Sequence, residues 1–492
     1  MAPGLDREEL ARVLEIALAR GADFAEVFLE ERQVCALTCE DDRIERVTTG
    51  REVGAGVRVI SGESTAYGYT NHLELDRLTD LARTVADTAR LRGSGEVVLD
   101  LRSVSAPYLL EIHRPPEQVP VSDRVALVRR ANAAARGEDP RIKQVLVNYA
   151  DTRQRVRIAN TEGDYVEDER VRVRLAVQAV AAAQGRLQTG YEAVGGFIGL
   201  ELFEQQPPEE VARTAARRSL LMLEARPAPT GRMTVVMAAE AGGTMVHEAC
   251  GHGLEADLVQ KGLSVYAGRL GQVVASPLIT VIDDATLPGR FGSYRFDDEG
   301  TPGQKTVLIE KGVLCSYMYD RLTARREGRR STGNGRRESY QYRPLPRMRN
   351  TYIAPGEHDP EEIIRRTERG LLVKKMGGGQ VNTTNGDFVF EVAEGYLIEG
   401  GRVTAPVRGA TLTGNGPEVL REVDMVGSDL GFSIGVCGKN GQGVPVSDAQ
   451  PTIRIPSLVV GGTACEAEAE GKTGDRAGRY ARGSGWRGGM RR

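Results

Sequence analysis

The chain has 492 residues, with 65 Lys and Arg against 68 Asp and Glu, and its formal net charge is −3. Because nucleic acid demands a basic surface, this balance argues against a protein that binds it over its whole face. The length allows two to four domains and a large apolar core without disulfide staples. Glycine accounts for 59 of the 492 residues, which is above its usual share of about 7% and indicates many turns.

The sequence gives no sign of export or membrane insertion. No apolar run reaches the ~18 residues of a membrane-spanning helix. The first ten residues include Asp6, Glu8 and Glu9 and lack the basic and apolar regions of a signal peptide. Six cysteines without paired spacing fit a reducing compartment. We therefore expect a cytoplasmic protein.

The first 228 residues alternate between two hydrophobic periods. Stripes at helical spacing, such as Leu10, Val13, Leu14 and Leu18, predict helices, and short alternating runs bounded by Gly and Asp predict antiparallel strands. The order helix, strands, helix occurs twice, which suggests two related halves or one domain with a duplicated layer. The predicted helices are 6–20, 73–91, 122–135 and 208–223, and the predicted strands are 24–29, 33–39, 56–60, 64–69, 144–149, 156–160 and 171–180.

The pattern changes after a Pro-rich segment, 226–231, that is typical of a linker. From there to residue 464 we expect short strands and glycine turns with only two or three helices. The fold class is therefore α+β, with an N-terminal helix-and-antiparallel-meander domain (1–228) before a β-rich domain (229–465). The remainder, 466–492, is Arg- and Gly-rich and holds Trp486, the only tryptophan. Its composition predicts a disordered tail.

One motif carries metal chemistry: His247-Glu-Ala-Cys-Gly-His252. Metallopeptidases of the familiar type place two histidines four residues apart on one helix face. Five residues turn a regular helix so far that the rings point about 140° apart. The two histidines can share a metal if a π-type bulge widens the turn, or if the helix ends before His252. Gly251 and Gly253 make either distortion cheap.

A metal site of this kind needs a third ligand and a base. Glu248, next to a candidate ligand, is suited to take a proton from a water that the metal activates. Cys250 and Cys437 are equally good third ligands on chemical grounds, and Glu255 and Asp257 rank behind them. Cys437 lies in a glycine-rich turn, where a thiol is not expected for packing alone.

The motif, extended to Asp257, resembles that of the TldD/PmbA family of metalloproteases, on the active TldD side. The resemblance covers most of residues 5–463. It implies a cytoplasmic peptidase subunit in which His247, His252 and Cys437 bind the metal and Glu248 is the base. Geometry also favours Cys437, because Cys250 sits in the turn that must be distorted. Further matching stretches are 297–302, 331–339, 346–352, 437–443 and 461–463.

Two other segments are candidates for substrate binding. Residues 321–349 hold ten Arg and two Glu. Arg336 and Arg337 in this segment are candidates for pairing with a peptide's carboxylates or carbonyls. We expect the run 376–386, which contains Gly378 and Gly379, to be a substrate-binding loop whose amides would pair with an extended peptide as an added strand does. A flexible basic loop without a ligand is the plainer interpretation of the first segment.

These observations predict a metal-dependent peptidase that hydrolyses unfolded or precursor peptides. Zn²⁺ is the default ion for two histidines and a cysteine, and the same ligands also suit iron. The resemblance implies a heterodimer with a PmbA/TldE-type partner subunit. The alternative is a non-enzymatic, nucleic-acid-associated regulator that uses segment 321–349 and the tail.

Overall fold

The computed structural model of the chain describes residues 5–89, 99–108 and 110–462. The predicted tail at 466–492, with Trp486, lies outside the described residues. The N-terminal half consists of α1 (Arg7–Leu18), β1 (Phe24–Glu40), β2 (Arg43–Ser61), β3 (Ser64–Thr70), α2 (Leu75–Thr88), β4 (Arg102–Ser103), α3 (Val121–Arg136), β5 (Ile142–Asn160), β6 (Asp164–Ala183), β7 (Arg186–Gly196), α4 (Leu202–Gln205) and α5 (Pro208–Glu224).

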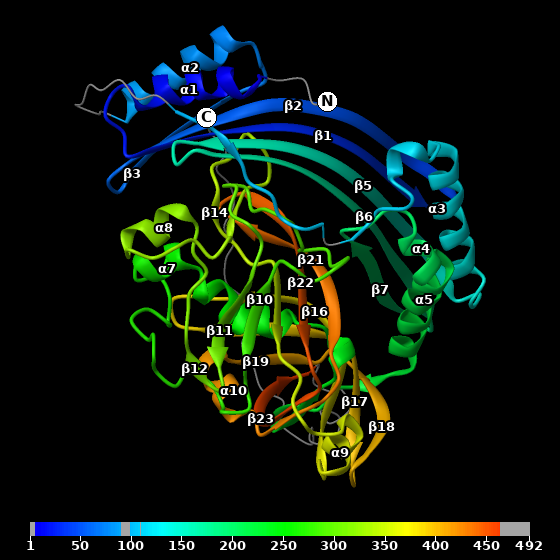
Figure 1. The fold of residues 1–492 in the computed structure, drawn as a ribbon. Coiled ribbons are helices and arrows are strands. Elements are labelled where there is room, and N and C mark those ends of the chain that lie inside the picture. Colours follow the sequence, from blue (N-terminus) through cyan, green and yellow to red (C-terminus); the bar gives the residue numbers. More distant parts are fainter. Residues whose placement is uncertain (1–4, 90–98, 109, 463–492) are drawn as a thin grey trace, which may run out of the picture.

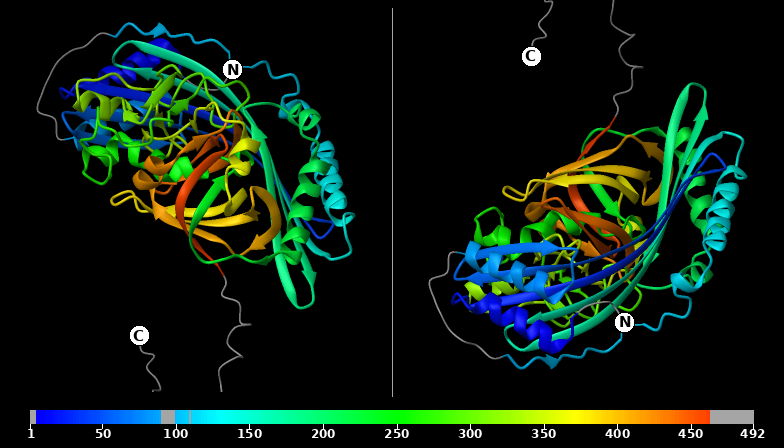
Figure 2. Two further views of the ribbon diagram at one scale, coloured as in Figure 1. Left: turned by 90° about the horizontal axis from the view of Figure 1, so that it is seen from below. Right: turned by 90° about the horizontal axis from the view of Figure 1, so that it is seen from above.

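The N-terminal half is one long, curved sheet. Its strands follow the order β3-β2-β1-β5-β6, and β4 and β7 also pair with β6. The central pair, β1 and β5, is antiparallel and joins the two helix–strands–helix repeats into a single sheet. The sheet arches over the other half of the molecule, with α1 and α2 at one end of its outer face and α3 and α5 at the other (Figures 1 and 2).

Each end of the sheet has its own apolar core. At one end, α1 and α2 bury Leu10, Leu14 and Leu78 against the sheet. At the other end, α3 and α5 bury residues such as Val128 and Ala215. The four long predicted helices are confirmed, with boundaries that shift by up to three residues.

The strands are longer than the sequence pattern predicts. Segments 24–29 and 33–39 belong to the single strand β1, and 144–149 and 156–160 to the single strand β5. The polar residues between them do not end the strand, because they have buried partners. Glu30 accepts hydrogen bonds from Gln154 Nε2 and from the backbone of Tyr340, each at 2.7 Å. Asp151 likewise pairs with Arg124.

The C-terminal half is built from shorter pieces. They are β8 (Arg226–Pro227), β9 (Gly231–Met237), α6 (Thr244–Val246), α7 (Ala256–Gln260), β10 (Val281–Asp284), β11 (Lys305–Glu310), β12 (Val313–Leu314), α8 (Arg321–Arg326), β13 (Gly335–Arg336), β14 (Leu345–Pro346), β15 (Asn350–Ile353), α9 (Pro360–Arg365), β16 (Arg369–Val381), β17 (Asp387–Glu399), β18 (Arg402–Arg408), β19 (Thr411–Asn415), α10 (Gly416–Glu422), β20 (Met425–Val426), β21 (Gly431–Lys439), β22 (Gln442–Gln450) and β23 (Ile453–Gly461).

These strands form two main sheets that share one core. One sheet has the order β12-β11-β10-β15-β22-β21, and the other has the order β16-β9-β23-β19-β17-β18-β8. Because β16 also pairs with β17, the second sheet closes into a ring of β16, β9, β23, β19 and β17. The motif helix contributes Val246, Ala249 and Cys250 to the core between them. The candidate ligands are thus held by a close-packed interior.

Two predictions for this half are wrong. Up to residue 462 it holds five α-helices, α6 to α10, instead of two or three. None exceeds seven residues, and such short helices leave no periodic pattern that would predict them. The glycine run at 376–386 is not one loop. Residues up to Val381 belong to β16, a turn occupies 382–386, and β17 begins at Asp387.

Candidate metal centre

The His-Glu motif forms a π-helical turn, which is one of the two distortions that the spacing of its histidines predicts. Residues His247–Gly251 make a π turn, closed by the His252 amide donating to the His247 carbonyl, and a 3₁₀ turn then spans His252–Leu254. The extra residue in the turn brings the two imidazoles onto one side, with ring centroids 4.9 Å apart. The irregular backbone therefore compensates for the five-residue spacing of the histidines.

The glycines of the motif serve packing more than backbone freedom. Neither Gly251 nor Gly253 adopts a positive φ. A Cβ on Gly251 would lie 2.2 Å from Met348 Sδ, and one on Gly253 would lie 2.8 Å from the Tyr266 ring. The π turn is thus pressed against its neighbours, and any larger residue would push it away.

Three donor atoms converge at this turn. One nitrogen from each of His247 and His252 and the Sγ of Cys437 all lie within 4.8 Å of one another, and this is the only such group among the described residues. Cys437 comes from the far end of β21, and its Sγ is 3.6 Å from His252 Nε2. The chain therefore gathers two nitrogens and one sulfur, the donor set of a zinc site that keeps a position open.

Both imidazoles are held from behind by carboxylates. His247 Nδ1 is 2.8 Å from Asp448 Oδ1, and His252 Nδ1 is 3.2 Å from Glu255 Oε2. A carboxylate accepts the Nδ1 hydrogen and leaves Nε2 free to bind a metal, and such partners orient metal-binding histidines. Burial lowers the pKa of His247, but the Asp448 carboxylate and the hydrogen bonds to Asp448 and Cys437 together raise it well above its usual value.

The thiol between the two rings has the charge that a ligand needs. Burial raises the pKa of Cys437, but hydrogen bonds from His247 and His252 outweigh it and bring the pKa down to about 5. The side chain is therefore a thiolate at neutral pH, and thiolates are the metal-binding form of cysteine. His247, His252 and Cys437 therefore suit a divalent metal ion that binds sulfur well.

The other candidate third ligands lie elsewhere. Cys250 is fully buried in the core, its Sγ donates to the Val246 carbonyl at 3.4 Å, and burial raises its pKa to about 12. Glu255 faces the back of His252. Asp257 pairs with Lys439 at 2.6 Å. Each carboxylate thus has a cationic or imidazole partner of its own.

Glu248 faces a cavity of about 430 Å³ that opens beside His247. Burial raises the pKa of Glu248, although His247 and His252 counteract this. A carboxylate whose pKa lies closer to neutrality is a better proton acceptor and donor in turn. The cavity wall also includes Gly378 from β16, Ile434 from β21 and Tyr191 from β7 of the N-terminal half.

The two glycines predicted to bind substrate have different surroundings. Gly378 lines the cavity and has open space where a Cβ would lie, whereas a Cβ on Gly379 would lie 2.0 Å from the Phe390 ring. The structure brings Gly378 to the cavity wall that also holds His247 and Glu248, and turns Gly379 toward the core.

The arginines predicted to bind substrate are buried away from the cavity. Arg336 donates to the carbonyls of Met348 and Pro445 at 2.6 and 2.8 Å. Arg337 pairs with Glu26 of β1 at 2.5 Å, with both side chains fully buried. Neither lines the cavity at the metal centre. In this structure the two arginines are held by protein partners, and Arg337 joins the two halves of the chain.

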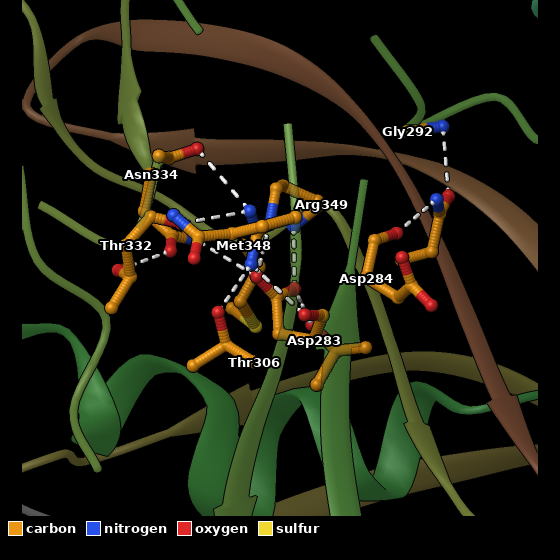
Figure 3. Close-up of polar contacts among 12 residues, drawn as sticks. Asp283, Asp284, Gly292, Thr306, Thr332, Asn334, Met348 and Arg349 are labelled. Atoms are coloured by element: carbon orange, nitrogen blue, oxygen red, sulfur yellow. Dashed lines mark hydrogen bonds and ion pairs between the residues drawn. The ribbon is translucent and has the colours of Figure 1, made fainter. Parts of the chain in front are cut away.

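Other parts of the basic segment are also used internally. Arg349 is fully buried and pairs with Asp283 through Nε at 2.5 Å, while Asn334 donates to the same carboxylate at 2.7 Å (Figure 3). Asp297 accepts from the Gly335 amide. The matching stretches 297–302, 331–339 and 346–352 therefore meet in one buried hydrogen-bonded network.

Asp448 is a residue that sequence reasoning missed. It lies on β22, whose register with β21 places it opposite Ser433, four residues before Cys437. No motif surrounds Asp448, and its role depends on hairpin pairing. From the sequence, Asp448 could have been found only by looking for acidic residues on the strand that follows Cys437.

Comparisons with known proteins agree along nearly the whole chain. Residues 25–89 match domain 1 of the PmbA/TldA metallopeptidases, residues 114–223 match the central domain, and residues 230–462 match the C-terminal domain. The Metalloprotease TldD homolog of Haemophilus influenzae is 37% identical over 93% of this chain and 97% of its own length. A metalloprotease of Methanothermobacter thermautotrophicus is 36% identical over 93% of this chain and its full length.

Solved structures share the fold at lower identity. A putative modulator of DNA gyrase from Thermotoga maritima superposes with a TM-score of 0.77 at 24% identity, over 92% of this chain and 99% of that one. TldE from Thermococcus kodakarensis gives 0.71 at 19% identity, over 92% and 99%. Among the described residues, no helix combines the length and apolar character needed to cross a bilayer. The chain belongs to the PmbA/TldD family of metallopeptidases and is a hydrolase of peptide bonds.

Proposed function

We propose that the chain is a zinc peptidase in which His247, His252 and Cys437 hold the ion and Glu248 is the general base. The observation that carries this proposal is the group of three donor atoms within 4.8 Å of one another, next to a carboxylate that faces a cavity. When bound, the ion supplies a Lewis acid that polarises the scissile carbonyl and makes water more acidic. Iron suits the same donors.

The protein's own residues then divide the work. Asp448 and Glu255 fix the two imidazoles, and the Cys437 thiolate reduces the charge of the site. Glu248 takes a proton from the attacking water and transfers it to the leaving amine. Its raised pKa supports both steps.

The proposed substrate is an unfolded or precursor peptide. A cavity of about 430 Å³ has room for a few residues of extended chain and not for a folded domain. Gly377 and Gly378 leave part of its wall without side chains, so a peptide backbone can approach the strand and pair with its amides.

We also propose that the peptidase works in the cytoplasm with a PmbA/TldE-type partner subunit. The described cysteines, among them Cys35, Cys39 and Cys315, are free thiols, which fits a reducing compartment. The fold shared with a TldE supports the pairing. We expect the purified chain alone to cleave peptides weakly and to gain activity when the partner is added, as a peptidase assay with each preparation would test.

The decisive experiment for the chemistry is Glu248→Gln. Loss of a general base typically costs 10²- to 10⁴-fold in rate, so we expect hydrolysis of an unstructured peptide to fall by about that factor. Metal content, measured by mass spectrometry, should stay near that of the unmodified chain. Loss of metal would instead make Glu248 a ligand, and unchanged activity would remove it from the mechanism.

A further inference from the structure

Three buried charged residues lie behind the metal centre and have no part in the proposed proton transfers. Arg347 and Glu255 are fully buried, and the side chain of Lys439 is 7% exposed. Burying such groups is costly unless each has partners. Their partners include one another, Asp257, the His252 ring, and the backbone carbonyls of Pro346 and Cys437.

On one side these residues reach His252. Glu255 Oε2 lies 3.2 Å from His252 Nδ1 and 3.1 Å from Lys439 Nζ. The lysine therefore holds the carboxylate that orients the imidazole. Asp257 holds the lysine in turn, at 2.6 Å.

On the other side they reach Cys437. Lys439 lies two residues after Cys437 on β21, and its ammonium donates to the Pro346 carbonyl at 3.0 Å. The next residue, Arg347, donates from Nη2 to the carbonyl of Cys437 itself. Arg347 Nε is also 4.0 Å from Glu255 Oε1. A closed set of contacts thus runs from the His252 ring to the Cys437 backbone.

His247 is attached differently. Among the contacts that the structure describes, its carboxylate partner is Asp448 alone, and Asp448 has no lysine or arginine within ion-pair distance. Lys439 and Arg347 balance the charges of Glu255 and Asp257, and these four residues lie on the side of His252 and Cys437. The contacts of Lys439 and Arg347 therefore fix the separation of His252 and Cys437, whereas the described contacts give His247 no comparable support.

We propose that Lys439, together with Arg347, is a positioning residue that sets the separation of His252 and Cys437, and through it the affinity and geometry of the metal site. This inference rests on the ligand set of the proposed function. Loss of the ammonium would leave Glu255 and Asp257 buried with less compensating charge. Glu255 would then move away from its anionic neighbour, and the His252 ring would move with it.

The test uses Co²⁺ as a spectroscopic probe in the full-length protein. For Lys439→Met we expect Co²⁺ and Zn²⁺ affinity, measured by competition with a chelator, to fall roughly 10- to 100-fold, as is typical when a partner behind a ligand is lost. The thiolate-to-cobalt charge-transfer band should shift or weaken, because the sulfur no longer meets the ion at the same distance. If Lys439→Met fails to fold, Arg347→Lys takes its place. This variant keeps the positive charge but loses the guanidinium group that donates to the Cys437 carbonyl, and it should show the same change in the band.

Two controls separate the inference from its foundation. Arg124→Met removes a buried ion pair to Asp151 of 2.8 Å in the N-terminal half and should lower stability without altering metal affinity or the band. Cys437→Ala should abolish the band. If it does not, the proposed ligand set fails, and the inference with it. If Cys437→Ala abolishes the band while Lys439→Met or Arg347→Lys leaves affinity and band unchanged, the inference alone is overturned.

Discussion

The two halves of the molecule meet at one cavity but contribute differently to it. The C-terminal half supplies all three donor atoms and Glu248. The N-terminal half supplies part of the wall, through Tyr191 and Ala193 of β7. It also supplies the buried Glu26, which binds Arg337 of the other half. Long regular strands give the molecule its shape, and the short irregular segments hold its chemistry.

The largest effect should come from breaking the C-terminal contribution. Cys437→Ala should lose the metal and all detectable peptidase activity, because two imidazoles alone hold zinc poorly. Because metal binding also stabilises the fold, its melting temperature should fall. Cys250→Ala should keep the metal, since Cys250 Sγ bonds to Val246 in the core. Metal analysis of both variants checks this, and the reverse pattern would mean that Cys250 is the ligand.

A smaller but clear effect should come from separating the halves. Arg337→Met leaves Glu26 with Arg58 as its remaining ion-pair partner and should cost about 3 kcal/mol of unfolding free energy, the low end for a broken buried pair. Arg51→Met removes an ion pair to Glu31 in which the arginine is half exposed, and should cost less than about 1 kcal/mol. Urea unfolding followed by circular dichroism distinguishes the two. Equal costs would mean that the buried pairs do not hold the halves together.

The smallest effects should come from the cavity walls, one from each half. Tyr191→Ala and Gly378→Ala alter the space beside Glu248 and should change kcat/KM by roughly tenfold for a given peptide, with metal content and stability unaltered. Gly379→Ala should instead lower stability by about 1–3 kcal/mol, because its Cβ meets Phe390. Kinetics and thermal unfolding of the three variants test this. A stable but inactive Gly379→Ala would place that residue in the substrate path.

The N-terminal fold was largely predictable because its apolar residues recur at helix or strand spacing over long stretches. The sequence pattern failed where charged residues interrupt a strand, as at Glu30, whose partners Gln154 and Tyr340 lie far along the chain. It also missed the strand β7. A local pattern contains no information about such partners. The same reason explains Arg337. Its charge predicts a ligand contact when read alone, but Glu26 neutralises it from the opposite half.

The metal centre was predictable in part. The spacing of His247 and His252, with glycine beside it, predicts either a π turn or a helix end before His252, and the structure has the π turn. The choice between Cys250 and Cys437 remained open on residue chemistry, because both are plausible thiols. The structure separates them by direction, since the Cys250 side chain points back along the helix to Val246. Asp448 and the contacts of Arg347 depend on strand pairing and could not be inferred from motifs.

The distance along the sequence between His252 and Cys437, 185 residues, has a consequence for biosynthesis. The ribosome makes both histidines and Glu248 long before it makes Cys437, and Asp448 emerges later still. An incomplete chain therefore carries two imidazoles without the thiolate. If His247, His252 and Cys437 hold the metal as proposed, the centre cannot assemble until β21 and β22 have been synthesised and paired. Proteins around a nascent or truncated chain would then be safe from hydrolysis by it.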